Sequence, residues 1–198
     1  MFSGVSDSTE RSRPSARVTE PIVVVDYDPA WPEAFARERD RIAAALGELA
    51  FAIEHHGSTA VPGLAAKPII DIMVAVQRLD DVSDHTARLV RAGYDRRPVG
   101  DIPGRLYFQR REEGRRHAHL SLAEQGSDFW LEHIAFRDAL RADQELARRY
   151  AALKRELAAR YREDRLGYTD AKTEFIRSAL AAARGRSARL GWAGESRR

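Results

Sequence analysis

The stretch that decides the fold is Ile53-Glu54-His55-His56-Gly57-Ser58-Thr59-Ala60-Val61-Pro62-Gly63-Leu64-Ala65-Ala66-Lys67-Pro68-Ile69-Ile70-Asp71-Ile72. It predicts a strand over 51–56, a turn-rich loop over 57–63 and a second strand over 67–76. Glycine lets backbone amides approach a phosphate, and the Ser58 and Thr59 hydroxyls add donors. Asp71, inside an apolar strand, could hold a hard cation against phosphate oxygens. This layout suits nucleotidyl transfer.

Each of these residues also has a structural interpretation. Gly57, Ser58 and Thr59 could form an ordinary turn with a capping hydroxyl. Asp71 could be a buried carboxylate with a protein partner, because burying a charge without one is costly. We nevertheless expect phosphate contact at Gly57, Ser58 and Thr59 and a site role for Asp71.

Working outward, the sequence predicts strands and helices before residue 127 and helices alone after it. Strands are expected at 22–25, 94–99, 105–111 and 115–122, and helices at 29–47, 80–92, 128–141, 143–162 and 169–184. Apolar residues form one stripe of the first helix, with Asp28 as its cap: Trp31, Phe35, Ile42, Leu46 and Leu49. The fold class is therefore α+β or mixed α/β, a mixed sheet with flanking helices and a C-terminal helical layer.

The ends of the chain differ from its body in composition. Residues 1–19 and 185–198 are polar and arginine-containing, so we expect two disordered tails around one domain at 20–184. The formal net charge is +3, yet residues 20–183 carry 25 basic and 27 acidic residues. The excess positive charge belongs to the tails, and nucleic-acid binding by the folded body is not expected.

Composition also excludes several classes of site. The chain has no cysteine, so disulfides, thiolate metal sites and cysteine nucleophiles are ruled out. Its apolar runs are far shorter than the ~20 residues of a membrane span, and the N-terminus has no signal-peptide core. We therefore expect a cytoplasmic protein with no membrane association; the oligomeric state is left open.

The quoted stretch closely resembles the signature of the GrpB family, which belongs to the nucleotidyltransferase-fold superfamily. The resemblance extends over roughly 21–182 and includes Tyr27-Asp28-Pro29-Ala30-Trp31, His117-Ala118-His119-Leu120 and Phe136-Arg137-Asp138-Ala139-Leu140-Arg141. It implies a nucleotidyltransferase-like fold. Because some family members are fused to dephospho-CoA kinase, it also hints at coenzyme A or adenine nucleotide metabolism. The superfamily's usual second strand acid is replaced here by Met73.

His117 and His119 are the candidates to replace that missing acid. Strand alternation would put both imidazoles on one face, where they could ligate a metal together with Asp71 or act as a base. We expect a divalent cation, Mg²⁺, Mn²⁺ or another transition metal, and ATP or another nucleoside triphosphate as substrate. A solvated sheet face, or a phosphate pocket without metal, is the alternative.

Lysine use gives a further hint, because only Lys67, Lys154 and Lys172 interrupt a chain whose other basic residues are arginine. All three lie in the segments that resemble the family, so we predict that they bind the ligand's phosphate groups. Arg137 is a weaker candidate, because it could instead form surface ion pairs with neighbouring acids.

Three functions follow from these residues. The first is an enzyme that transfers a nucleotidyl or phosphoryl group to a small molecule, with Asp71, His117 and His119 as catalytic residues. The second is a non-catalytic module that binds a nucleotide or coenzyme A-type ligand, as the Met73 replacement suggests. The third is RNA binding through the arginine-rich C-terminal tail.

Overall fold

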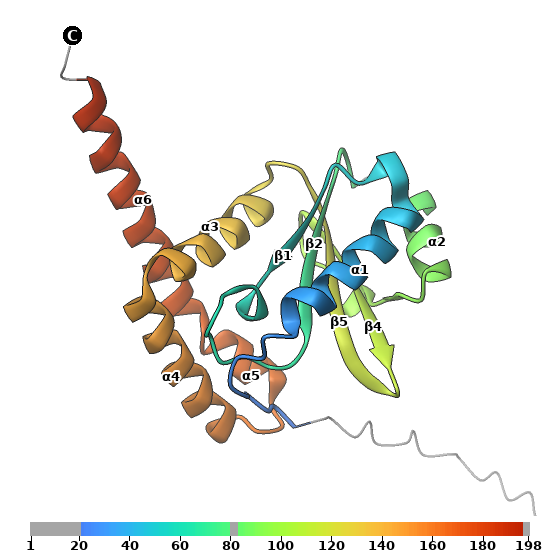
Figure 1. Cartoon of the computed structure of the whole chain (residues 1–198), viewed down its shortest axis with the longest axis horizontal. Helices are drawn as coiled ribbons and strands as arrows, with labels where there is room; N and C mark the ends of the chain where they lie inside the picture. Colours follow the sequence, from blue (N-terminus) through green and yellow to red (C-terminus); the bar gives the residue numbers. More distant parts are fainter. Residues whose placement is uncertain (1–20, 80–82, 196–198) are drawn as a thin grey trace, which may run out of the picture.

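A five-stranded mixed sheet is the centre of the computed structural model, which describes residues 21–79 and 83–195, with 186–195 as backbone only (Figure 1). The strands are β1 (Ala52–His56), β2 (Ile70–Val76), β3 (Asp95–Arg96), β4 (Arg105–Glu112) and β5 (Arg115–Glu124). Their order is β1-β2-β5-β4-β3, and only β2 and β5 run parallel. The predicted fold class is confirmed.

The strand expected over 22–25 is the main error among the strands. Val25 forms an isolated antiparallel bridge with Ala66, and Ile22 donates its amide hydrogen to Arg162 O. Ile22 packs with Leu157 and Tyr168 beneath the C-terminal helices. The β-branched run therefore provides packing contacts and does not extend the sheet. The expected strand at 94–99 shrinks to β3, followed by the short 3₁₀ turn Pro98–Gly100 (η3).

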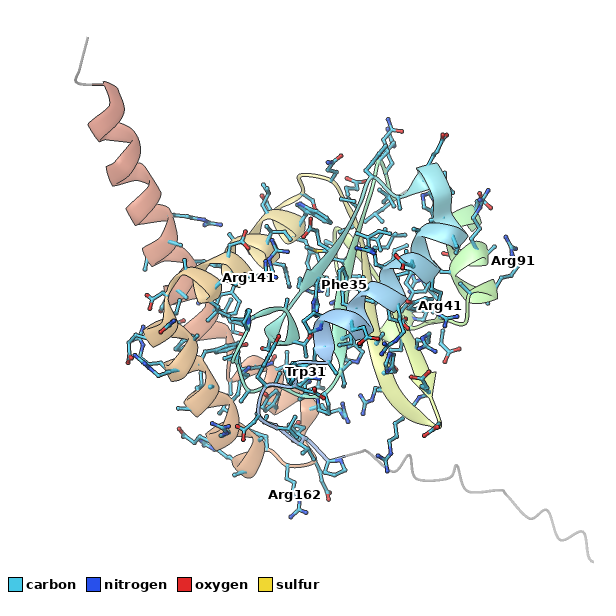
Figure 2. All side chains as sticks on the ribbon, in the orientation of Figure 1. Trp31, Phe35, Arg41, Arg91, Arg141 and Arg162 are labelled. Atoms are coloured by element: carbon cyan, nitrogen blue, oxygen red, sulfur yellow. The ribbon has the colours of Figure 1, made fainter. Side chains whose placement is uncertain are left out.

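Helices α1 (Trp31–Leu46) and α2 (Ser83–Arg91) cover one face of the sheet (Figure 1). Trp31 and Phe35 lie on α1 (Figure 2), and the predicted stripe of this helix packs on the sheet as expected. Asp28 accepts a hydrogen bond from the Ala30 amide at 2.8 Å but does not cap the helix directly. The helix ends at Leu46 with Gly47 as its C-cap residue, and Gly47–Leu49 (η1) leads into β1.

The remaining helices gather beside β1, away from α2 (Figure 1). They are α3 (Asp128–Ala142), α4 (Gln144–Arg160), α5 (Arg165–Asp170) and α6 (Thr173–Glu195). The helix expected at 169–184 is thus two helices, and the second continues to Glu195 beyond the expected boundary at Arg184. The predicted tail at 1–19 lies outside the described residues. Among the described residues, no helix is long and apolar enough to cross a membrane.

Besides the small cluster around Ile22, two larger apolar cores follow from this arrangement. The larger lies between α1, α2 and the sheet, and β2 contributes alternate residues to it from Ile70 to Val76. The smaller joins α3, α4 and α6 to the loop after β1 through Val61 and Leu64. The opposite face of β2, which carries Asp71, is therefore turned away from the main core.

Candidate functional site

Asp71 and His119 meet across the parallel pair β2 and β5, where they are direct register partners. Nδ1 of His119 lies 3.2 Å from Oδ1 of Asp71, within hydrogen-bonding distance. The Asp71 side chain remains 33% exposed, whereas His119 is 17% exposed. Nε2 of His119 is buried and has no hydrogen-bond partner. The carboxylate is therefore held by one imidazole and is still accessible to a ligand.

Gly57 forms the wall of the site directly behind this carboxylate. Its φ of +69° lies in the left-handed region, and a Cβ atom there would come within 2.5 Å of Asp71 Oδ2. A side chain at this position would therefore be strained and would collide with the aspartate. The glycine predicted from the turn is required both by its backbone conformation and by the close approach of Asp71.

Ser58 and Thr59 begin the short 3₁₀ turn η2 (Ser58–Ala60), but their hydroxyls face different surroundings. Ser58 hydrogen-bonds to the side chain of Tyr150 on α4. Thr59 is 1% exposed, and its Oγ1 lies 2.9 Å from Nε2 of His55. Thr59 is therefore occupied by a protein contact, and the expectation that its hydroxyl binds phosphate has no geometric support.

The three lysines of the chain come together on the Asp71 side of the molecule. Nζ of Lys67 and Nζ of Lys172 lie 5.3 and 4.4 Å from the centre of the Tyr168 ring, and Nζ of Lys154 lies 4.7 Å from that of Tyr150. Lys154 is 3% exposed and donates a hydrogen bond to Ala65 O.

The charge balance around these lysines is unusual for a partly buried site. Among the described residues, no Asp or Glu forms an ion pair with any of the three ammonium groups, and Asp71 is the one carboxylate that raises the pKa of all of them. Buried ammonium groups normally have an anionic partner, because burial removes the water that stabilises their charge. The cluster therefore carries excess positive charge.

Burial and mutual repulsion act on the protonation of the cluster. Burial, followed by the charge of Lys172, lowers the pKa of Lys154 to about 7. Burial, followed by the charge of Lys67, lowers the pKa of Lys172 to about 8. Burial alone would raise the pKa of Asp71, but the hydrogen bond and charge of His119 hold it well below its ordinary value. Asp71 is consequently ionised at neutral pH.

His117 does not join this site, which corrects the expectation that both histidines share a face. The β4–β5 register shifts at Arg110/Arg111, because Arg110 pairs with Ala118 while Arg111 pairs with Arg116. His117 is the extra residue of this bulge, and a bulge locally breaks strand alternation. Its Nδ1 lies 3.2 Å from Glu112 and its Nε2 3.6 Å from the buried Glu38, on the α1 side of the sheet.

Arg137 is held by protein groups. Its guanidinium lies 2.6 Å from Glu54 and 2.8 Å from Asp138, and it donates to His55 O at 3.0 Å. On the same helix, Arg141 donates two hydrogen bonds to Ala60 O (Figure 2). The two arginines fasten α3 to edge strand β1 and to the η2 turn, so the geometry gives Arg137 a structural role.

The predicted metal site of Asp71, His117 and His119 does not assemble. Within residues 21–79 and 83–195, no three His, Asp or Glu side chains are grouped so that they could hold a metal ion. Asp71 alone fits a different arrangement, because Mg²⁺ is usually bound by one or two carboxylates together with substrate phosphates and water. A cation that arrives with a phosphate ligand is compatible with this donor set.

Sequence reasoning did not connect the lysines with the two tyrosines that contact them. Tyr150 and Tyr168 are 5% and 1% exposed. Each precedes a lysine by four residues, in the pairs Tyr150–Lys154 and Tyr168–Lys172. Tyr150 and Lys154 both lie on α4, where this spacing places two side chains side by side, and a cation–π contact then favours the ammonium group. Lys172 lies in the turn between α5 and α6 and contacts the Tyr168 ring from there. The repeated spacing was the available signal.

The chain matches the family described as GrpB protein over residues 21–182. It is 36% identical over 159 residues to Glutamate-rich protein GrpB of Alkalihalophilus pseudofirmus, covering 78% of this chain and 91% of that protein. It is 37% identical over 158 residues to UPF0157 protein YqkA of Bacillus subtilis, covering 80% of this chain but only 46% of YqkA.

A solved structure agrees with these matches. The crystal structure of conserved protein GrpB from Enterococcus faecalis superposes with a TM-score of 0.75 at 32% identity. The alignment covers 83% of this chain and 99% of the other.

Proposed function

This chain belongs to the GrpB family, and from that premise we propose that it is a nucleotidyltransferase-like enzyme that binds a phosphate-containing ligand, with a nucleoside triphosphate as the expected donor. The observation that carries the proposal is the cluster of Lys67, Lys154 and Lys172, which has no acidic ion-pair partner among the described residues and adjoins Asp71. A polyphosphate would supply the missing negative charge. It would also restore the protonation that burial opposes in these lysines.

Each side chain has a defined part in the proposed binding. The ammonium groups of the three lysines would neutralise the phosphates, and the Gly57 backbone with the Ser58 hydroxyl would border them. Asp71 would hold a divalent cation brought by the ligand, which supplies charge neutralisation at the phosphate oxygens. His119 would keep Asp71 oriented through its hydrogen bond.

The proposed reaction is a displacement at phosphorus. An acceptor oxygen forms a bond to phosphorus, the bond to the leaving phosphate breaks, and the acceptor's proton passes to solvent. Charge neutralisation and positioning provide most of the acceleration in phosphoryl-group chemistry, so a site built from fixed lysines and one carboxylate suits this step. The leaving phosphate would depart with its charge balanced by the lysine cluster.

A second function is favoured by Met73. This residue occupies the position of the second strand acid and is 0% exposed in the core, so it offers the ligand nothing. The absence of an acid at position 73 is consistent with a protein that binds the same phosphate ligand but does not catalyse its reaction. Such a module would bind its ligand with an affinity that does not depend on a divalent metal.

Calorimetric titration tests the proposal and separates the two functions. Wild type, Asp71→Asn and the double variant Lys154→Met/Lys172→Met would be titrated with ATP, GTP, CTP, UTP and coenzyme A, each with Mg²⁺, with Mn²⁺ and without metal. Asp84→Asn is the matched control, because Asp84 is an exposed acid on α2 that pairs with Arg88.

Metal-dependent binding that Asp71→Asn and the double lysine variant both lose would support the enzyme, and release of pyrophosphate or phosphate with an acceptor mixture would establish turnover. Binding that needs the lysines but neither metal nor Asp71 would support the module. Unchanged binding in the lysine variant would contradict both functions.

A further inference from the structure

A second feature of the molecule lies next to the lysine cluster and is not explained by phosphate binding. A cavity of about 770 Å³ opens between the segment at Pro21–Val23, the residues leading into β2, the end of the β4–β5 hairpin and α5. This volume falls within the roughly 300–1,000 Å³ typical of small-molecule sites. A phosphate group alone would leave most of it empty.

Lys67 joins this cavity to the proposed phosphate site. It lines the cavity, and its Nζ also lies 5.3 Å from the centre of the Tyr168 ring, within the lysine cluster. On β5, Arg116 and His117 line the cavity immediately before His119, the partner of Asp71. A ligand with its phosphates at Lys67 and Asp71 could therefore extend directly into this space.

The walls of the cavity combine an apolar side with a charged rim. Ile22, Val23 and Pro68 provide apolar surface, while Glu113 and Arg115 from the hairpin provide polar groups. Such a lining suits a flat, partly polar group, because arginine can stack on its face and a carboxylate can accept hydrogen bonds from its amino groups. A nucleoside has this chemistry and this size.

We infer that this cavity binds the base and ribose of a nucleotide whose phosphates lie at Lys67 and Asp71. The inference rests on the proposed function, since it needs the phosphate site beside it. It adds the place at which the nucleoside of that ligand binds and the contribution of the nucleoside to affinity.

The test compares inorganic tripolyphosphate with ATP, GTP, CTP and UTP by calorimetry on the full chain. Val23→Trp narrows the cavity and leaves Asp71 and the three lysines unaltered, because Val23 is 51% exposed and lines the cavity. Val90→Trp is the matched control, with a valine 52% exposed on α2. Val23→Phe, which adds less volume, replaces the first variant if that one does not fold.

We expect wild type to bind at least one nucleoside triphosphate about tenfold or more tightly than tripolyphosphate. Val23→Trp should lower the affinity for that nucleotide to the affinity for tripolyphosphate, and the affinity for tripolyphosphate itself should not change. Val90→Trp should behave as wild type. Tripolyphosphate binding with no advantage for any nucleotide, or an advantage that survives Val23→Trp, would overturn the inference and leave the proposed phosphate site intact. Failure of every phosphate compound to bind wild type would overturn the proposed function and this inference with it.

Discussion

Replacing Lys154 by methionine is expected to stabilise the folded protein at pH 7 while abolishing phosphate binding. Lys154 is 3% exposed on α4, and its ammonium group donates to Ala65 O but forms no ion pair with an acid among the described residues. Methionine has a similar length and carries no charge to bury. The substitution therefore removes an unfavourable charge and keeps most of the packing.

The lowered pKa of Lys154 sets the size of the expected stabilisation. Lowering the pKa of Lys154 from 10.5 to about 7 corresponds to about 5 kcal/mol of unfavourable interaction with the charged form. Loss of the hydrogen bond to Ala65 O offsets about 1 kcal/mol of this. Relaxation of the site takes up a further part. We expect the free energy of unfolding at pH 7 to rise by about 2–4 kcal/mol.

The effect should depend on pH in a defined direction. Between pH 7 and 10.5 the unfolded chain keeps the lysine proton that the folded protein has released, so the stability of wild type rises with pH across this window. Below pH 7 the lysine is charged in both states and its penalty is fully present. Lys154→Met should lack this rise, and its advantage over wild type should shrink toward pH 10.

Urea unfolding at pH 7 and pH 10, at constant ionic strength, measures both quantities. Arg148→Met is the control, because Arg148 lies on the same helix with its side chain 72% exposed. If Lys154→Met were less stable than wild type at pH 7, or if the two proteins changed equally between pH 7 and 10, the reasoning about the buried charge would be refuted.

Three further predictions follow from the same geometry. Gly57→Ala should destabilise the fold by about 1–3 kcal/mol in urea unfolding and abolish phosphate binding in calorimetry. The reason is that the added Cβ would strain the backbone and collide with Asp71. Wild-type affinity in this variant would contradict the close approach of Gly57 and Asp71. Arg137→Met should cost about 1–3 kcal/mol in the same unfolding assay, since it leaves Glu54 and His55 O without their donor; a neutral result would remove its structural role. Affinity for tripolyphosphate should fall between pH 7 and 9, where Lys154 and Lys172, with pKa values of about 7 and 8, lose their protons; calorimetry that shows constant affinity would exclude these lysines from the site.

The sheet was predictable where turn chemistry and strand patterns agree. The run from Ile53 to Ile72 predicted β1, the Gly57 turn and β2, because glycine and proline separate two apolar segments. Ile22–Val25 has the same β-branched composition, yet a single bridge to Ala66 is its only ladder contact among the described residues. Composition indicates that such a run is extended, but the partner that makes it a strand is set by tertiary packing.

The contact between Asp71 and His119 could be anticipated from the sequence, but the arrangement of the other candidate residues could not. Asp71 and His119 follow from alternation on two strands, and their contact needs only the parallel register of β2 and β5. The expectation that His117 shares a face with His119 was wrong because a bulge shifts the strand register by one residue. No local pattern marks the position of that bulge. The lysines are 18 to 105 residues apart along the chain, so only the folded helical layer brings them together.

The lysine cluster also explains how a site with one strand acid can be electrostatically consistent. A second carboxylate at position 73 would favour a second cation, but Met73 is buried, and within the described part of the chain His119 is the one direct ionic partner of Asp71. Three neighbouring ammonium groups make the surroundings unfavourable for a bare metal ion and favourable for a polyanion, because Coulomb interactions are strong where water is excluded. A phosphate ligand would lower the repulsion among the lysines. Asp71 and the ligand would then hold one cation between them. In the proposed site, the single strand acid and the fixed lysine charge are therefore complementary, because the protein itself, more than bound metal, would neutralise the ligand.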